Sequence, residues 1–223
     1  MNFNNVHEQD IEVIKQFGLP LSEYESHLEV KYYDVQHAVI TVVSNRITAI
    51  ETRGHSMMIP KSVNQLEQLK HLVMKKTRLN QVPKTINELE ELRVLDLRDN
   101  NINFFPYIKD NAQLSRILLG SNSINKIPRW VSQLERIEQL YLGHNKISEI
   151  PRFIGELPKL EVLYLCHNQI SALPESLLET PSLKELCIRG TPVAHDYKTR
   201  ITAGLEDGVI QALISKGVKV YLD

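Results

Sequence analysis

The chain has 223 residues, a formal net charge of −1 and 42% hydrophobic residues, which suits one soluble unit with a continuous buried core. A near-zero charge gives no general reason to expect nucleic acid or an anionic membrane as a partner, since either usually leaves a basic excess. No stretch approaches the ~20 apolar residues of a membrane helix, and the first residues lack the apolar run of a secretory signal. We therefore expect a cytoplasmic protein that contacts neither nucleic acid nor a membrane.

The first 46 residues do not repeat and are assigned to an N-terminal cap. DIEVIKQFG predicts a helix, because Val13, Ile14 and Phe17 share one face and Gly18 supplies a stop. LEVKYYD and AVITVVS predict two strands of a hairpin that covers the first repeat. An independent catalytic domain is the alternative for this segment.

From residue 47 the chain repeats with a nearly constant period. The tripeptides MIP, QVP, FFP, KIP, EIP and ALP end in prolines at 60, 83, 106, 128, 151 and 174, in steps of 23, 23, 22, 23 and 23. Four clean copies of L-x-x-L-x-L-x-x-N-x-I precede them: LRVLDLRDNNI from Leu92, LSRILLGSNSI from Leu114, IEQLYLGHNKI from Ile137 and LEVLYLCHNQI from Leu160. Weaker copies begin at Ile47, Leu69 and Leu183.

These repeats resemble the leucine-rich repeat family, in its class of roughly 23 residues that ends in IP or LP. Similar repeats occur in Ras-suppressor-type proteins and in stand-alone prokaryotic proteins. Over residues 47–193 the resemblance implies an α/β fold, a curved solenoid with a parallel concave sheet and short helical or 3-10 turns on the convex side. It also implies that Asn100, Asn122, Asn145 and Asn168 form a hydrogen-bonded ladder.

The residue pattern agrees with stacked repeats. In x-L-x-L-x a period of two sends alternate leucines inward and leaves the residues between them facing solvent. No repeat can bury its leucines alone, so each neighbour must cover the next. Residues 194–223 are assigned to a C-terminal cap, in which GLEDGVIQALISKG predicts a helix and VKVYL a strand.

The solvent-facing strand positions carry the functional prediction. Leu118, Tyr141, Tyr164 and Cys187 occupy the slot between the two core leucines in consecutive repeats, and neighbouring strands lie ~4.8 Å apart. Such a stripe suits a binding hot spot, although stacked tyrosines could also merely stabilise each other. His144 and His167 follow in the same repeats. With Cys166 they could ligate zinc, but a fourth ligand is not evident and we predict no metal site.

Basic residues mark the N-terminal half of the same face. Lys75, Arg98 and Arg116 lie near Asp96 and could orient an acidic partner surface, or form an ordinary solvated face. Trp130 and Phe153 share a slot after their prolines. They either pack into the convex layer or, if exposed, offer a rival interface.

Only Cys166 and Cys187 could form a disulfide. They belong to adjacent strands but lie two residues out of register, which places their Cα atoms ~8 Å apart, beyond the ~7 Å limit for bridging. We therefore expect two free thiols.

We found no catalytic motif with a nucleophile and its base, no phosphate-binding glycine loop and no zinc-binding histidine spacing. The leading hypothesis is a monomeric, non-enzymatic protein-binding module without a cofactor. Its anchors are Leu118, Tyr141, Tyr164, His144 and His167, and its orienting contacts are Arg98, Arg116 and Lys75. Resemblance to Ras-suppressor-type repeats suggests a small GTPase or a phosphatase as partner. A self-associating structural element is the alternative, and an enzyme with an unrecognised site comes third.

Overall fold

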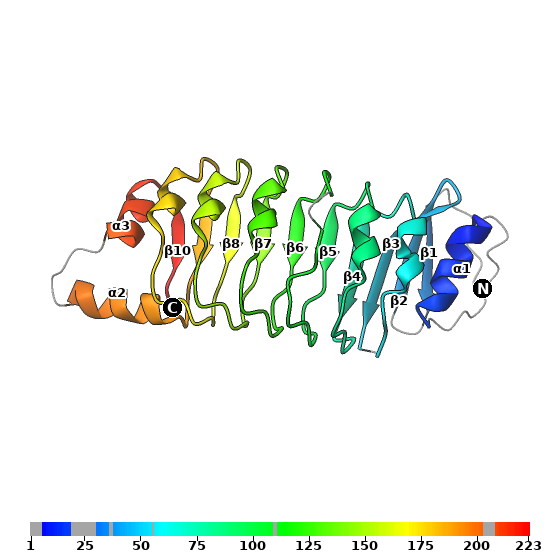
Figure 1. Ribbon diagram of the computed structural model, residues 1–223, viewed down its shortest axis with the longest axis horizontal. Coiled ribbons are helices and arrows are strands. Elements are labelled where there is room, and N and C mark those ends of the chain that lie inside the picture. Colours follow the sequence, from blue (N-terminus) through cyan, green and yellow to red (C-terminus); the bar gives the residue numbers. More distant parts are fainter. Residues whose placement is uncertain (1–5, 19–29, 36–37, 55, 109–110, 203–207) are drawn as a thin grey trace. The chain divides into compact units, whose positions relative to one another are not determined.

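The computed structural model describes residues 6–18, 30–35, 38–54, 56–108, 111–202 and 208–223 (Figure 1). The chain divides into two compact units. Unit 1 consists of Met1–Ile102 with Pro106–Leu114, and unit 2 consists of Asn103–Phe105 with Ser115–Asp223. Within each unit the strands lie in chain order.

Unit 1 begins with helix α1 (Glu8–Gln16) and continues with β1 (Val30–Val35), β2 (Ala38–Val43), β3 (Arg46–Arg53), β4 (His71–Lys75) and β5 (Val94–Asp96). The first three strands are antiparallel, whereas β3, β4 and β5 are parallel. The hairpin β1–β2 thus extends the sheet by pairing with β3. Helix α1 is anchored by the buried Asp10, which accepts hydrogen bonds from the Ile47 amide (2.8 Å) and Arg46 Nε (3.1 Å).

Unit 2 contains the parallel strands β6 (Arg116–Leu118), β7 (Gln139–Tyr141), β8 (Val162–Tyr164), β9 (Glu185–Cys187) and β10 (Lys219–Tyr221). Helices α2 (Pro192–Thr202) and α3 (Gly208–Ser215) lie between the last two strands in sequence. The sequence pattern predicted α3 and β10 but not α2, which starts at a proline, a residue whose fixed φ suits a first helical position. Leu205 of the predicted helix lies outside the described residues.

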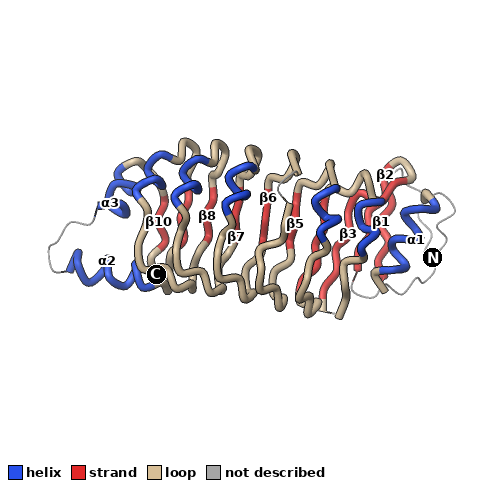
Figure 2. Tube along the Cα trace, viewed as in Figure 1, coloured by secondary structure: helices blue, strands red, loops and turns tan. Residues whose placement is uncertain are grey.

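Short 3-10 turns return the chain after five of the prolines (Figure 2), at Lys61–Gln65, Lys84–Glu88, Arg129–Gln133, Arg152–Glu156 and Glu175–Glu179. Each turn buries an apolar side chain in the same slot, which is Val63, Ile86, Val131, Ile154 or Leu177, and the turn Arg152–Glu156 also buries Phe153. The strand leucines are equally buried: Leu95, Leu97, Leu140, Leu142, Leu163 and Leu165 are 0% exposed. The core of each unit therefore lies between its strands and its 3-10 turns, as the period of two predicted.

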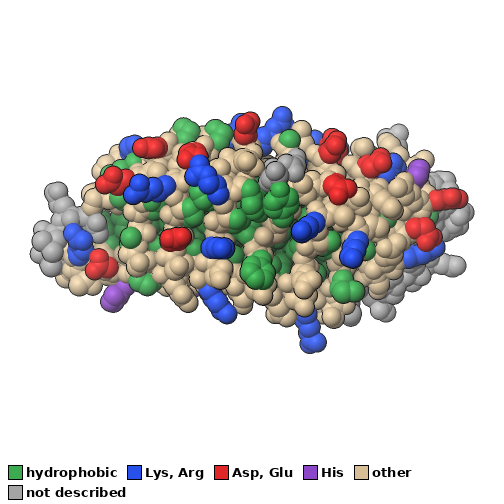
Figure 3. Space-filling model, in the orientation of Figure 1, with side chains coloured by type: hydrophobic (Ala, Val, Ile, Leu, Met, Phe, Trp, Pro, Cys, Tyr) green, Lys and Arg blue, Asp and Glu red, His purple; other side chains and the backbone are tan. Residues whose placement is uncertain are grey.

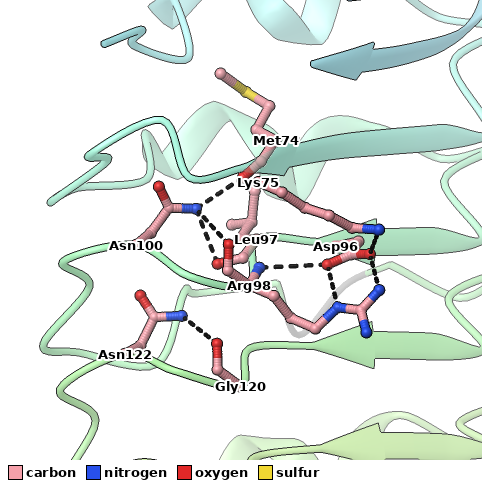
Figure 4. A network of polar contacts seen from close by, with 8 residues as sticks. All are labelled: Met74, Lys75, Asp96, Leu97, Arg98, Asn100, Gly120 and Asn122. Atoms are coloured by element: carbon pink, nitrogen blue, oxygen red, sulfur yellow. Dashed lines mark hydrogen bonds and ion pairs between the residues drawn. The ribbon is translucent and has the colours of Figure 1, made fainter. Parts of the chain in front are cut away.

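Asn100, Asn145 and Asn168 join consecutive repeats, as the resemblance implied, and Asn122 donates to the carbonyl oxygens of Leu119 and Gly120 in its own repeat (Figure 4). Asn100 Oδ1 accepts hydrogen bonds from the amides of Thr77 and Leu79, both at 3.0 Å. Its Nδ2 donates to the carbonyl oxygens of Met74 (2.7 Å) and Leu97 (3.0 Å). Asn145 and Asn168 repeat this pattern in unit 2. Each amide therefore satisfies polar backbone groups of its own repeat and of the preceding one.

The outer copies use different residues in the asparagine slot. Thr77 is fully buried and donates its hydroxyl to Asn100 Oδ1 at 3.0 Å. Thr191 donates its hydroxyl to the carbonyl oxygen of Ile188 in its own repeat. His55 lies outside the described residues. A threonine hydroxyl offers one hydrogen-bond donor where an asparagine amide offers two, so the ladder has fewer hydrogen bonds in these copies.

We expect Asn100→Ala to lower the free energy of unfolding by about 2–4 kcal/mol, because it leaves several buried backbone groups without partners. Urea denaturation followed by circular dichroism measures this. Asn101→Ala is the matched control, since Asn101 is exposed and only its backbone amide makes a described bond. Equal losses in both variants would contradict the role of the ladder.

Candidate functional site

The sheet of unit 2 aligns a stripe of large side chains on its solvent-facing side. Leu118 pairs in register with Tyr141, Tyr141 with Tyr164, Tyr164 with Cys187, and Cys187 with Tyr221 of β10. We call these five residues the tyrosine surface. The structure thus brings together the predicted anchors Leu118, Tyr141 and Tyr164, and it adds Tyr221 at the C-terminal end.

The three tyrosine rings contact one another edge to face. The ring centroids of Tyr141 and Tyr164 are 4.6 Å apart with planes inclined by 63°, and those of Tyr164 and Tyr221 are 5.9 Å apart at 73°. Aromatic pairs prefer this geometry because the positive edge of one ring meets the negative face of the other. The rings therefore support each other and form a rigid platform rather than three independent side chains.

A single carboxylate holds two of the tyrosine hydroxyls. Tyr164 donates to Glu185 Oε2 at 2.8 Å, and Tyr221 donates to the same oxygen at 3.2 Å. Burial and then the hydrogen bond to Glu185 raise the pKa of the Tyr164 hydroxyl, so this group remains a neutral donor. Lys219 Nζ lies 4.7 Å from the centroid of the Tyr221 ring, in cation–π contact.

The predicted histidines lie three residues beyond Tyr141 and Tyr164 along the chain and stack on each other. The rings of His144 and His167 have centroids 4.3 Å apart and planes inclined by only 20°. Both residues have positive φ, 56° and 53°, at the turn that precedes the ladder asparagine. In the next repeat this position is Gly190 (φ 68°), where any side chain would collide with the His167 ring. The repeat turn therefore fixes the two imidazoles in the turns that follow β7 and β8.

The stacked position affects the protonation of His167. Desolvation lowers its pKa from the ordinary value, and the neighbouring His144 and Arg189 lower it further. A cation is disfavoured in this position because two other basic groups face it. His167 is therefore held toward its neutral form, which can both donate and accept a hydrogen bond.

The structure corrects the prediction for the cysteines. Cys166 and Cys187 form a disulfide, and their Cα atoms are 5.4 Å apart. The distance expected from the sequence assumed straight strands that continue past Tyr164. In fact β8 ends at Tyr164 and the chain starts to turn, while the Leu165 amide donates to the Cys187 carbonyl oxygen at 2.8 Å. This turn brings Cys166 against Cys187, so the expectation of two free thiols was wrong.

The predicted basic residues do not form one group. Lys75 and Arg98 belong to unit 1, where both bind the buried Asp96: Lys75 Nζ lies 3.1 Å and Arg98 Nη2 2.8 Å from Asp96 Oδ2 (Figure 4). Arg116 belongs to unit 2, where it is exposed at the start of β6 and pairs in register with Gln139. Only Arg116 therefore shares a unit with the tyrosines.

The aromatic residues of the 3-10 turns pack inward. Phe153 is 7% exposed, and Arg129 lies over its ring at 5.8 Å from the centroid. Trp130 is half-buried and contacts Phe105 edge to face, with centroids 5.4 Å apart. These residues belong to the convex layer. The aromatic side chains that are open to solvent in unit 2 include the half-buried tyrosines of the tyrosine surface and Phe104, which is 70% exposed.

Other classes of site lack support in the part of the chain that is described. No three His, Cys, Asp or Glu side chains there are grouped so as to hold a metal ion. No helix within the described residues is long and apolar enough to cross a membrane. Figure 3 shows acidic and basic side chains interspersed over the face turned toward the viewer.

Comparisons with known proteins agree with the repeat. The model of the family described as Leucine Rich Repeat matches residues 159–180. A leucine-rich repeat protein of Leptospira interrogans has a similar structure, with a TM-score of 0.56 and 33% identity over 60% of this chain and 34% of that chain. The chain is a leucine-rich repeat protein.

A second similar structure is the leucine-rich repeat ectodomain of the membrane receptor kinase GASSHO1/SCHENGEN3 from Arabidopsis thaliana. It was solved in complex with CASPARIAN STRIP INTEGRITY FACTOR 2. The TM-score is 0.60, and the identity is 26% over 67% of this chain and 19% of that chain. The present leucine-rich repeat protein spans about a third of the Leptospira chain and about a fifth of the plant one. Among curated proteins no match was found.

The sequence prediction missed Tyr221 and Glu185. Tyr221 lies outside the repeats, and only its place in the predicted strand VKVYL signalled that it could join the sheet. The register that puts it beside Cys187 depends on helices α2 and α3, which have no counterpart in the repeat. Glu185 occupies the slot held by Gln139 and Val162 in other repeats, so its position gave no functional signal.

We expect an NMR titration to give His167 a pKa below the ordinary value of about 6.5, and His144→Asn to raise it by removing one basic neighbour. Asparagine tolerates the positive φ of this position. The unfolded chain binds a proton at His167 more tightly than the folded chain does. The contribution of His167 to the free energy of unfolding is therefore fully present above about pH 6.5 and is lost as pH falls through the folded pKa. The free energy of unfolding, measured with urea, should fall less between about pH 7.5 and about pH 5 in His167→Asn than in wild type. A normal His167 pKa would contradict this account.

Proposed function

We propose that this leucine-rich repeat protein binds a partner protein through the tyrosine surface. Leucine-rich repeats are in general protein-interaction modules, and one similar structure was solved with a bound partner. The observation that supports the proposal most is the edge-to-face row of Tyr141, Tyr164 and Tyr221 on the solvent-facing side of the sheet. Nothing in the packing of the core requires aromatic residues there, because leucine, cysteine and valine occupy equivalent slots elsewhere.

The arrangement has the properties of a binding hot spot. The rings offer large contact area at little cost in side-chain entropy, because their neighbours and Glu185 already restrict them. His144 and His167 add polar groups in the turns after β7 and β8, and Arg116 adds a positive charge at the β6 end. A partner that buries the tyrosines could therefore form hydrogen bonds around an aromatic centre, as effective interfaces do.

The proposals for the class of partner, the cellular role and the location rest on the sequence resemblance. We propose a small GTPase or a phosphatase as partner, a role in signalling, a cytoplasmic location and no catalytic activity of the chain itself. The Cys166–Cys187 disulfide provides the test of this location, since such bonds persist mainly in oxidising compartments.

We further propose that the protein is a monomer. Strand β10 ends the sheet of unit 2, and it carries the exposed Lys219. Charged side chains on an edge strand oppose pairing with another copy. Light scattering across a concentration series should give the mass of one chain throughout, whereas a mass that rises with concentration would favour the self-associating alternative.

We expect Tyr141→Ala/Tyr164→Ala to weaken binding of the natural partner at least about 30-fold, which corresponds to about 2 kcal/mol. The partner is first captured from lysate of the native organism with the wild-type chain, and its affinity for each purified variant is then measured by calorimetry. The loss follows from removing the centre of the aromatic platform while the buried leucines stay in place.

Tyr107→Ala is the matched control, because Tyr107 is 41% exposed and belongs to unit 1. All variants must melt at temperatures close to that of wild type. Equal affinities for the wild type and the double variant would refute binding through the tyrosine surface.

A further inference from the structure

The solvent-facing side of the unit 1 sheet contains a second feature that could hold a ligand. A depression of about 540 Å³ is lined by Val39, Glu51, Thr52, Arg53, Gly54, Val73 and Lys75. Its volume falls within the range of about 300–1,000 Å³ that is common for ligand pockets. None of these residues belongs to the tyrosine surface, and all of them lie in unit 1.

Three adjacent strands build the depression at two levels. At the first level Val39 of β2 pairs with Glu51 of β3, and Glu51 pairs with Val73 of β4. At the second level Arg53 pairs with Lys75. Gly54 follows Arg53 with a φ of 86°, and its missing side chain leaves open space beside the two cations. The depression thus has two valines that flank Glu51 at the first level and a basic end at the second.

The basic end has more positive charge than the neighbouring carboxylate can neutralise. Lys75 and Arg98 share the single buried side chain of Asp96 (Figure 4). Arg53 is exposed and forms no ion pair among the described residues. Arg53 and Lys75 therefore lie side by side on β3 and β4, and Arg98 follows two residues after the end of β5. Of these three cations, Arg53 is free to bind an anion.

This charge is not a requirement of the repeat. The slot of Arg53, Lys75 and Arg98 is filled by Gly120, Gly143 and Cys166 in three repeats of unit 2, and by Arg189 in the last repeat. The strands of unit 2 form with the same parallel pairing despite the absence of a cation in those three repeats. The basic row is therefore a property of this surface rather than a structural need of the fold.

We propose that the depression binds an acidic peptide segment of a partner protein, with an aliphatic side chain inserted between Val39 and Val73. Carboxylates that flank this side chain reach Arg53 and Lys75. Arginine can bind a carboxylate through two parallel hydrogen bonds, which gives orientation as well as attraction. The exposed Glu51 disfavours a ligand carboxylate at the first level, so acidic groups are directed to the Gly54 end.

The probe is a fluorescein-labelled peptide of six residues with a central leucine between glutamates, titrated with the full chain and followed by fluorescence anisotropy. We expect Arg53→Glu to weaken binding at least tenfold, and salt raised from about 0.05 M to about 0.5 M to weaken it as well. Lys159→Glu is the matched control, because it reverses an equally exposed charge in unit 2. It should change the affinity less than about twofold.

Two further arms test the contact with the valines. Val73→Lys adds a positive charge but fills the space between Val39 and Val73. If the peptide binds in this specific site, the variant should bind it more weakly. If the peptide is held only by charge attraction, the variant should bind it more tightly. Replacing the central leucine of the peptide by serine should weaken binding to wild type. All variants are compared only if their melting temperatures agree.

The proposal is overturned if the wild-type chain does not bind the peptide, or if Arg53→Glu and Lys159→Glu weaken binding equally. It is also overturned if serine replaces leucine without effect, or if inorganic pyrophosphate competes as well as the unlabelled peptide, since either result indicates a general anion site. The Tyr141→Ala/Tyr164→Ala variant should bind the peptide like wild type, so the outcome is independent of the tyrosine surface.

Discussion

The hydrogen bonds between each ladder asparagine and the preceding repeat are the interaction on which the other features depend. Asn100 and Asn145 each join backbone groups of two repeats, which no leucine contact could do with the same directionality. Because every ladder residue must lie at the same point of its turn, the chain before it adopts positive φ at Asp99, Ser121, His144 and His167. The register of the strands, and with it the alignment of their solvent-facing side chains, follows from this constraint.

Because the strands are in register, the solvent-facing side chains of each unit form a continuous surface, and these surfaces differ between the two units although the repeat is the same. In unit 2 the slot between the core leucines holds Tyr141 and Tyr164, and β10 continues the row with Tyr221. In unit 1 the slot two residues further along the strand holds Arg53 and Lys75, which line the depression. Core packing does not determine which residues occupy these slots in either unit, because their side chains point to solvent. Such positions are where a repeat protein can vary its ligands without changing its fold.

The sequence predicted what periodicity controls and missed what depends on irregular segments. The leucines, the 3-10 turns after the prolines and the ladder recur every 22 or 23 residues, so a single pattern located them. Tyr221 joins the sheet only through helices α2 and α3, of which the sequence pattern predicted one. The disulfide was missed because Cys166 lies just past the end of β8, where a straight-strand estimate of distance fails. The division of the basic residues between two units likewise has no sequence signal.

Hydrogen–deuterium exchange of the full chain, with and without its captured natural partner, tests the central claim most directly. Backbone amides near a buried interface exchange more slowly, and those elsewhere do not change. The account predicts protection confined to 139–144, 162–167 and 219–221, the segments that carry the tyrosines and the stacked histidines. Protection confined to the 3-10 turns around Trp130 and Phe153, with no change in these strands, would contradict it.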